Sequence, residues 1–356
     1  MSMSTRFIGI PTRELDQVVD LVGSRWEQLR GQRLLLTGGT GFIGKWLLST
    51  FLYANRQLNL SANAVVLSRR VKNFIADFPE LRDCADLVWL NGDVRELSTV
   101  TVGECSYAIH AATDVVTTST PADVLDTCVI GTRRVLEVMA LGSTKRRMLL
   151  LSSGAVYGRT PPEVCRIPED WLGAPNPLDP ASAYGEGKRT SELLCSIAVA
   201  ACPHLEVSIA RCFAFVGPHL PLDKHFAIGN FIGAAMHNKD IHVQGDGTPL
   251  RSYLYTSDMA YWLWTMLFDA PSGRAYNVGG TESLSISELA HRVSGVLGST
   301  GSIKIAQKQR IGVAAQAYVP SLNRAIDELN LRALVDLDEA ILRTAAWHRS
   351  SSRSMC

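Results

Sequence analysis

A tyrosine and a lysine four residues apart are the side chains of this sequence best suited to chemistry. They bound the segment Tyr184-Gly185-Glu186-Gly187-Lys188. Residues four apart lie on one face of a helix, so this spacing brings the phenol close to the ammonium. The positive charge would help to lower the pKa of the phenol. The pair therefore predicts a proton carrier for the interconversion of an alcohol and a ketone, with Tyr184 and Lys188 as catalytic residues.

A serine about 30 residues upstream can serve the same reaction. Ser153 lies in the stretch 151–158, LSSGAVYG, after a predicted strand, where its hydroxyl would hydrogen-bond the reacting oxygen. A tyrosine and a lysine at this spacing often occur together by chance, and it is the combination with Ser153 that favours a catalytic site. The alternatives are structural: Ser153 would cap the end of a strand, and Tyr184 would be a surface residue at the start of a helix.

The stretch 37–44, TGGTGFIG, has glycines at intervals of three between a predicted strand and a predicted helix. Such glycines allow a tight turn, close approach of the backbone to a pyrophosphate and close packing of helix on strand. The N-terminus of the helix would then face the anion. The alternative is a glycine turn that serves packing alone. The residues predicted to bind a dinucleotide here are Gly38, Gly41, Phe42, Ile43 and Gly44.

The residues that follow the second predicted strand are Ser68, Arg69 and Arg70, with no carboxylate among them. A carboxylate at this position binds the 2′-hydroxyl of NAD, whereas arginine accommodates the 2′-phosphate of NADP. The sequence therefore favours NADP(H), with NAD(H) possible and with solvated surface arginines as the alternative. Asp93, after the third strand, is placed to reach the adenine amino group. The remaining predicted cofactor contacts are Val94, Ala111, Ala112, Tyr184 and Lys188.

Short apolar segments separated by helical patterns predict the architecture. Strands are expected at 33–37, 64–68, 87–90, 107–112, 148–152 and 207–210. Helices are expected at 12–30, 42–54, 122–141, 183–201 and 285–297, the last with Ser285 as its N-cap and Glu288 three residues later. Apolar strands joined by crossover helices predict an α/β fold: a Rossmann-type, doubly wound parallel sheet with both faces covered.

The same pattern predicts the domain organisation. Residues 1–31 would form a helical extension, 32–216 the NAD(P)-binding domain, 217–349 mainly a smaller substrate-binding lobe, and 350–356 a tail. The lobe and the sheet could exchange segments.

Length and composition exclude several classes of protein. The 356 residues are 46% hydrophobic and 19% charged, which excludes a disordered chain, and the formal net charge of +1 gives no basic excess for nucleic acid. No apolar run reaches the length of about 18 residues that a membrane span needs. The charged N-terminus predicts no signal peptide, and the eight scattered cysteines indicate a reduced, cytoplasmic protein. His204, near Cys195 and Cys202, lacks a coherent ligand set, so no metal site is predicted.

Taken together, these motifs resemble the extended short-chain dehydrogenase/reductase family, specifically its nucleotide-sugar epimerase/dehydratase branch, over residues 33–345. Further segments similar to that family are AIHAAT at 108–113, RCFAFVGP at 211–218, GDGTPLRSY at 245–253 and YNVG at 276–279. The resemblance implies a nucleotide-diphosphate sugar as substrate, a Ser153–Tyr184–Lys188 catalytic set and a homodimer formed through the helix of Tyr184 and its neighbour. It also implies that Arg251 binds the diphosphate and that Asn230 opens the helix over the nucleotide base.

Three departures from the family pattern bear on the reaction. Gly154 and Ala155 follow Ser153 where the family's 4,6-dehydratases have Asp-Glu, and the decarboxylases place a Glu nearby. Glycine and alanine cannot transfer protons, so a dehydratase is disfavoured. Cys128 stands where the family normally has the Asn of a water relay, and Ala214 stands where it has an Asn that contacts the diphosphate.

Two reactions remain open. In one, NADPH reduces a 4-keto (6-deoxy) sugar nucleotide and Tyr184 supplies the proton; in the other, an epimerase oxidises C4, lets the keto sugar rotate and returns the hydride to the other face. The arginines after the second strand favour the reductase, whereas the segment 152–158 looks closer to the epimerases. A 4,6-dehydratase and a non-catalytic dinucleotide-binding protein are the lesser alternatives.

Overall fold

The computed structural model describes residues 7–113, 119–224, 226–309 and 315–353, and the chain divides into two compact units. The first unit comprises residues 1–158, 174–211 and 260–276; the second comprises 159–173, 212–259 and 277–356. The chain thus leaves the first unit and returns to it more than once.

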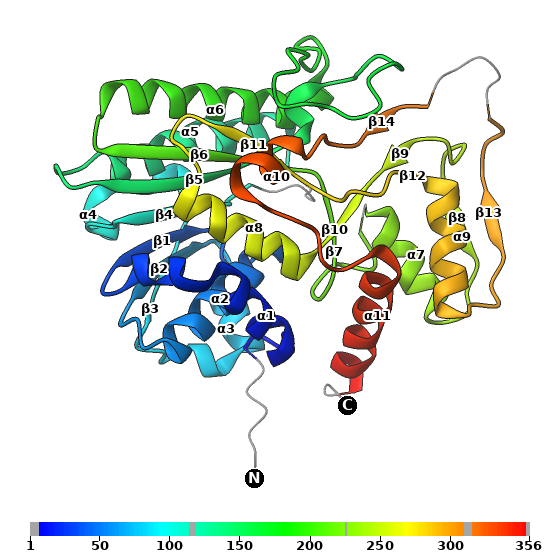
Figure 1. The fold of residues 1–356 in the computed structure, drawn as a ribbon, viewed down its shortest axis with the longest axis horizontal. Coiled ribbons are helices and arrows are strands. Elements are labelled where there is room, and N and C mark those ends of the chain that lie inside the picture. Colours follow the sequence, from blue (N-terminus) through cyan, green and yellow to red (C-terminus); the bar gives the residue numbers. More distant parts are fainter. Residues whose placement is uncertain (1–6, 114–118, 225, 310–314, 354–356) are drawn as a thin grey trace. The chain divides into compact units, whose positions relative to one another are not determined.

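A seven-stranded sheet forms the centre of the first unit, in the order β11-β6-β5-β4-β1-β2-β3 (Figure 1). Its strands are β1 (Arg33–Thr37), β2 (Asn63–Ser68), β3 (Leu87–Asn91), β4 (Tyr107–His110), β5 (Arg146–Ser153), β6 (Leu205–Cys212) and β11 (Ala275–Val278). The pairs β1–β2, β2–β3, β1–β4 and β4–β5 are parallel. The predicted doubly wound sheet is confirmed.

The burial of the central strands shows why they take this arrangement. Leu34, Leu35 and Leu36 of β1 are each at most 1% exposed, as are the β2 residues paired with them, at 64–66. A continuous apolar run is buried on both faces, which requires helices above and below the sheet. The strand order reverses beside β1, which has β2 on one side and β4 on the other. Ligands of such folds bind at this reversal, outside the carboxyl ends of the strands.

The helices of the first unit are largely where the sequence predicts them. They are α1 (Thr12–Val22), α2 (Phe42–Gln57), α3 (Val71–Asp77), α4 (Thr99–Val102), α5 (Pro121–Met139), α6 (Ala183–Ala201) and most of α8 (Thr256–Asp269). Short 3-10 turns are η1 (Gly23–Leu29), η2 (Pro79–Leu81), η3 (Val94–Glu96), η4 (Gly154–Tyr157) and η5 (Pro180–Ser182). Apolar residues of α5 and α6 pack in one core with β4 and β5.

The N-terminal extension differs from the single helix predicted over 12–30. Helix α1 ends at Val22, because Gly23 takes a φ of 60° and the chain continues as η1. This break turns Trp26 into the core, where its ring lies 4.7 Å from that of Trp264 and 5.8 Å from that of Phe268 on α8. The extension is therefore part of the core of the first unit.

The second unit is built from small sheets and helices. Strands β7 (Ala214–Val216) and β10 (Tyr253–Tyr255) pair, as do β8 (Ile241–Val243) and β13 (Ile303–Ile305), and a third sheet has the order β12-β9-β14. The strands of that third sheet are β9 (Leu250–Arg251), β12 (Leu284–Ser285) and β14 (Ala317–Tyr318). The helices are α7 (Ala227–Ala235), α9 (Ile286–Leu297), α10 (Asn323–Leu329) and α11 (Leu337–Arg353). The predicted capping box of Ser285 and Glu288 is present at the start of α9. Within the described ranges, no helix has the length and apolar character needed to cross a membrane.

Candidate active site

The glycine-rich loop joins β1 to α2 in a turn that a side chain would disrupt. A Cβ on Gly44 would lie 2.1 Å from the carbonyl oxygen of Gly38, and a Cβ on Gly38 would lie 2.8 Å from the backbone of Ala111. The loop therefore packs directly on the end of β4 and on the first turn of α2. Gly41 is the N-cap of α2, so the unpaired N–H groups of this turn begin at the loop, where an anion binds favourably.

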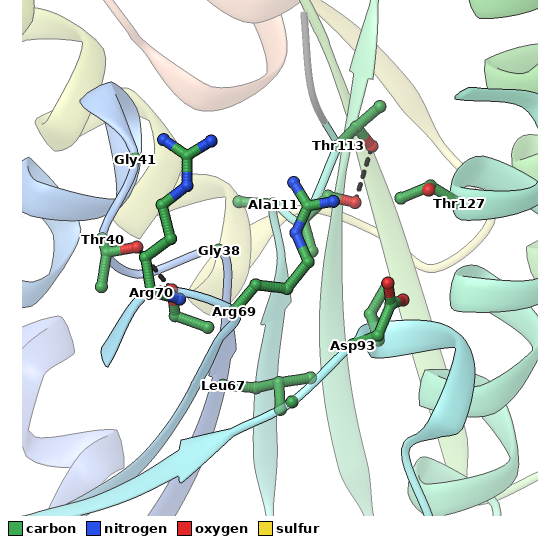
Figure 2. A pocket seen from close by; sticks show the side chains of 14 residues that line it. Gly38, Thr40, Gly41, Leu67, Arg69, Arg70, Asp93, Ala111, Thr113 and Thr127 are labelled. Carbon is green, nitrogen blue, oxygen red and sulfur yellow. Dashed lines mark hydrogen bonds between the residues drawn. The ribbon is translucent and has the colours of Figure 1, made fainter. Parts of the chain in front are cut away.

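A cavity of about 210 Å³ opens beside this loop, at the carboxyl ends of the strands (Figure 2). The predicted cofactor residues that line it are Gly38, Gly41, Ser68, Arg69, Arg70, Asp93, Val94, Ala111 and Ala112. Phe42, Ile43 and Gly44, in the first turn of α2, do not line it, and neither do Tyr184 and Lys188 on α6. The lining residues that sequence reasoning missed are Thr40, Leu67, Gly92, Thr113 and Thr127.

The end of β2 forms a polar wall of this cavity. Thr40 Oγ1 lies 2.6 Å from Ser68 Oγ, which accepts a hydrogen bond from the backbone N–H of Arg70 at 3.1 Å. The side chains of Arg69 and Arg70 are exposed; Arg70 lies beside Thr40 and Gly41, and Arg69 lies between Arg70 and Asp93 (Figure 2). Both guanidinium groups can therefore reach an anion that lies over the glycine loop.

Asp93 faces the same cavity and is held as a carboxylate. Its Oδ1 accepts from the backbone N–H of Arg95 at 2.9 Å and from Arg95 Nε at 3.1 Å, and its Oδ2 accepts from Arg95 Nη2 at 2.9 Å. These bonds from Arg95 are the main reason why the pKa of Asp93 is lowered, and the charge of Arg69 adds to the effect. The contact with Arg95 was not predicted.

The tyrosine and lysine of the predicted catalytic pair lie together on the first turns of α6. Lys188 Nζ is 5.9 Å from the ring centroid of Tyr184. The ammonium is only 3% exposed and donates hydrogen bonds to the Leu151 carbonyl at 2.7 Å and to Thr113 Oγ1 at 2.9 Å. Because Thr113 also lines the cavity, the charge of Lys188 lies close to the wall of this cavity.

Ser153 is the last residue of β5, the strand that also carries Leu151. Its side chain is 6% exposed, and its Oγ accepts a hydrogen bond from the backbone N–H of Ala155 at 3.2 Å, which caps η4. This contact is of the kind expected if Ser153 has a structural role and caps the end of its strand. Gly154 and Ala155, the first two residues of η4, offer no side chain able to transfer a proton.

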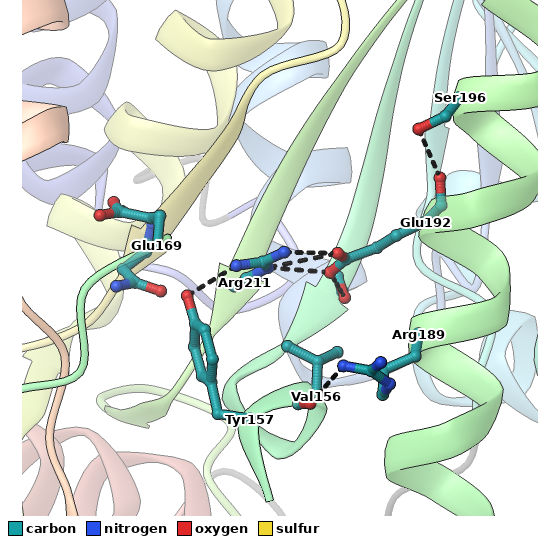
Figure 3. A network of polar contacts seen from close by, with 9 residues as sticks. Val156, Tyr157, Glu169, Arg189, Glu192, Ser196 and Arg211 are labelled. Atoms are coloured by element: carbon teal, nitrogen blue, oxygen red, sulfur yellow. Dashed lines mark hydrogen bonds and ion pairs between the residues drawn. The ribbon is translucent and has the colours of Figure 1, made fainter. Parts of the chain in front are cut away.

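A partly buried ion pair fastens α6 to the strands beside it (Figure 3). Arg211 on β6 binds both carboxylate oxygens of Glu192 on α6, with Nη2 to Oε2 at 2.7 Å and Nε to Oε1 at 3.1 Å. Arg211 Nη1 donates to the Tyr157 hydroxyl at 2.9 Å, and Ser152 Oγ donates to Glu192 Oε1 at 2.5 Å. Removing one partner of this pair leaves a partly buried charge without its counter-ion. The pair thus holds α6 against the ends of β5 and β6.

A second polar chain runs through the core from the loop towards α6. The hydroxyl of Thr37 accepts from the N–H groups of Ala111 and Ala112, at 3.2 and 3.3 Å, so its own proton goes to His110 Nδ1 at 2.7 Å. His110 is therefore the tautomer protonated at Nε2, which donates to Thr132 Oγ1 at 3.1 Å. Burial, together with the charge of Lys188, lowers the pKa of His110 to about 3.

This chain of hydrogen bonds ends on α6, the helix that carries the predicted catalytic pair. Thr132 Oγ1 donates to Ser191 Oγ at 3.0 Å, and the Ser191 hydroxyl has two carbonyl acceptors at 2.9 Å, those of Cys128 and Gly187. A Cβ on Gly187 would lie 2.8 Å from the Cβ of Cys128, so α5 and α6 are in close contact here. The residue that departs from the family pattern, Cys128, is therefore a packing residue of this contact.

We expect the neutral state of His110 to make stability fall with acid. Below pH 6.5 the unfolded chain protonates this histidine, whereas the folded chain does so only near pH 3. The free energy of unfolding therefore loses up to about 1.4 kcal/mol per pH unit as the pH falls through this range. A His110→Gln variant should show a shallower fall between pH 6.5 and 4.5 in urea titrations. The exposed His237, changed to Gln, is the control and should keep the slope. Equal slopes in all three proteins would contradict the assignment.

The two predicted substrate residues belong to the second unit. Asn230 is exposed on α7. Arg251, on β9, donates from Nη1 to the carbonyl of Leu250 at 2.8 Å and lies 5.4 Å from the ring centroid of Tyr318. Ser153, Tyr184 and Lys188 belong to the first unit.

Comparison with known proteins gives one family and several similar chains. A model of the NAD dependent epimerase/dehydratase family matches residues 34–279. UDP-glucuronic acid decarboxylase 1 of Xenopus tropicalis is 28% identical over 322 residues, which cover 89% of this chain and 72% of that protein.

Solved structures with the same fold carry nucleotide sugars and NAD. MoeE5 in complex with UDP-glucuronic acid and NAD is 26% identical, with a TM-score of 0.71 over 90% of this chain and 99% of that chain. UDP-glucuronic acid 4-epimerase from Bacillus cereus, in complex with UDP-glucuronic acid and NAD, has a TM-score of 0.74 at 20% identity, over 90% of this chain and 99% of that chain.

Proposed function

Because the chain belongs to the NAD dependent epimerase/dehydratase family, we propose that it is an oxidoreductase acting on a nucleotide-diphosphate sugar. Its reaction is the NADPH-dependent reduction of a 4-keto (6-deoxy) sugar nucleotide. The observation that carries the proposal is the position of Lys188: its ammonium lies beside the ring of Tyr184 and bonds to Thr113 on the wall of the dinucleotide cavity.

The residues around the cavity fit a dinucleotide. The glycine loop and the N-terminus of α2 would hold the pyrophosphate, and Asp93 the adenine. Arg69 and Arg70, at the end of β2 where no carboxylate competes, would bind a 2′-phosphate. These two arginines are the reason to propose NADP(H) over NAD(H).

The proposed mechanism assigns one task to each of three side chains. The bound dinucleotide supplies the hydride for C4. Tyr184 donates its phenolic proton to the C4 oxygen as the carbonyl becomes an alcohol, and Ser153 hydrogen-bonds the same oxygen. Lys188 stabilises the tyrosinate that remains, since an ammonium nearby favours the ionised phenol. Solvent then returns the proton to Tyr184, which completes the cycle.

The turn after Ser153 supports a redox reaction without elimination. Gly154 and Ala155 in η4 provide no acid or base to remove water across C5–C6. This chain therefore lacks, at that turn, the groups that the family's dehydratases and decarboxylases use. A C4 epimerase is the second candidate, because it needs the same three side chains and the segment 152–158 looks closer to the epimerases.

The experiment that tests the function follows absorbance at the nicotinamide band. Purified protein is mixed with NADPH and a panel of 4-keto sugar nucleotides, and in parallel with the saturated sugar nucleotides. Loss of NADPH in proportion to product supports the reductase. Isomerised product without net loss of NADPH supports the epimerase. Binding of dinucleotide with no turnover on any member of the panel contradicts both and supports a non-catalytic binding protein.

A homodimer formed through α5 and α6 is part of the proposal. Both helices expose large apolar side chains: Leu125 and Ile130 on α5 are 37% and 39% exposed, and Leu193 and Ile197 on α6 are 60% and 56% exposed. The two on α6 are four residues apart and share one face. Light scattering should give a mass near twice 38.8 kDa, and a Leu193→Asp variant should shift towards monomer. A monomeric native protein would contradict this assignment.

A further inference from the structure

The hydroxyl of Thr113 is in contact with the buried ammonium of Lys188. It accepts a hydrogen bond from Lys188 Nζ at 2.9 Å and donates one to the carbonyl of Ala112 at 2.7 Å. The direction is unambiguous, because an ammonium carries only donors and a carbonyl only accepts. Thr113 is 75 residues away from Lys188 in the sequence, at the carboxyl end of β4.

The burial of Lys188 makes its hydrogen-bond acceptors important. A charged group that is 3% exposed is costly unless it is hydrogen-bonded, and the described acceptors are Thr113 Oγ1 and the Leu151 carbonyl. Leu151 contributes a backbone oxygen that no substitution removes. Thr113 contributes an acceptor that a substitution can remove.

The neighbouring titratable side chains of His110, Cys128 and Cys195 do not replace the Thr113 hydroxyl as a hydrogen-bond acceptor for the Lys188 ammonium. His110 on β4 is buried and neutral, and burial raises the pKa of the Cys128 thiol on α5 and of the Cys195 thiol on α6. Those thiols therefore stay uncharged near neutral pH, and a thiol is a weak acceptor. Tyr184, on the same helix, is the proposed proton carrier itself.

We propose that Thr113 is a positioning residue for the catalytic reaction: its hydroxyl fixes Lys188 as a charged donor beside the phenol of Tyr184. In this chain a threonine on the cavity wall, and not the asparagine replaced by Cys128, supports the lysine. The inference rests on the proposed roles of Tyr184 and Lys188. It names a side chain that acts through the lysine.

The consequence is a change in the pH dependence of turnover. Without the hydroxyl, the ammonium is held less firmly and stabilises the tyrosinate less. The pH at which Tyr184 titrates then moves upward, by about one unit if one hydrogen bond to a charged group is lost. A purely structural role of Thr113 would lower stability and leave this midpoint in place.

The test compares Thr113→Val, which keeps the shape and removes the hydroxyl, with Thr113→Ser, which keeps the hydroxyl. Full-length protein is assayed with its dinucleotide and sugar substrate across the pH range, and melting temperature and cofactor affinity are recorded for each variant. We expect Thr113→Val to lower kcat about tenfold and to shift the midpoint upward, and Thr113→Ser to restore both. Thr190→Val is the matched control, because the Thr190 hydroxyl donates to a carbonyl of its own helix, that of Glu186.

The outcomes separate this inference from the proposed function. If Tyr184→Phe and Lys188→Met abolish turnover while Thr113→Val keeps the wild-type midpoint, the role of Thr113 is wrong and the function stands. If Tyr184→Phe and Lys188→Met keep turnover, the proposed function itself is wrong. Should Thr113→Val fail to fold, Thr113→Ala is assayed in its place and judged by the same midpoint. An upward shift in the valine or alanine variant, reversed by serine, supports the inference.

Discussion

Replacing Tyr184 by phenylalanine should lower kcat by roughly 1,000-fold, the scale of a lost general acid. The phenylalanine ring keeps the size of the side chain and removes only the hydroxyl that carries the proton. Tyr184 does not line the cavity beside the glycine loop, so dinucleotide affinity should stay nearly unchanged. Turnover by absorbance and affinity by fluorescence titration measure the two effects separately.

The control for this change is a tyrosine far from the proposed chemistry. Tyr107 begins β4, at the end of the strand opposite to the cavity, and its ring contacts Phe268. Tyr107→Phe removes the same atoms from the same residue type and should keep turnover. An undiminished rate in Tyr184→Phe would reject the proton-carrier role, and equal losses in both variants would point to a general effect on the fold.

Replacing Arg69 by alanine should weaken NADP(H) binding by roughly 10- to 100-fold, the loss expected for hydrogen bonds between charged groups. NAD(H), which lacks the 2′-phosphate, should bind almost as before. The physical reason is the position of Arg69 at the end of β2, exposed on the wall of the cavity, where a guanidinium can bind phosphate oxygens in pairs. Titrations with both dinucleotides at one ionic strength measure the ratio of the affinities.

Arg82→Ala is the matched control for the Arg69 variant. Arg82 is also exposed and its loss changes the net charge equally, but it does not line the cavity. It should leave the ratio of NADP(H) to NAD(H) affinity unchanged. Equal weakening of both dinucleotides in Arg69→Ala would contradict the proposed cofactor, and a wild-type preference for NAD(H) would do so directly.

The parts of the site that could be predicted from the sequence depend on short-range geometry. The four-residue spacing of Tyr184 and Lys188 places them on one helical face wherever the helix lies, and the glycine spacing of residues 38–44 requires a tight turn between strand and helix. The same holds for most elements: α6 has the predicted bounds, and β1 does as well. Local spacing and apolar runs are sufficient to predict features that depend only on residues close together in the sequence.

The prediction of one continuous helix over residues 12–30 was wrong, because a single glycine, Gly23, ends the helix. The apolar face of residues 12–30 continues past Gly23, yet the left-handed conformation of that glycine ends α1 and directs Trp26 towards α8. The helical period alone does not show such a break, because the partner ring on Trp264 is more than 200 residues away. The exchange of segments between the two units was likewise left open by the sequence.

The residue types, their spacing within each element and the family are thus determined by the sequence alone. The tertiary structure decided which distant groups meet: Thr113 with Lys188, His110 with Thr37, and Arg211 with Glu192. The reason is that parallel strands bring their carboxyl ends to one edge of the sheet, so residues that follow different strands become neighbours. Which of them face one another depends on strand order and register, and these are set by the packing of the whole core.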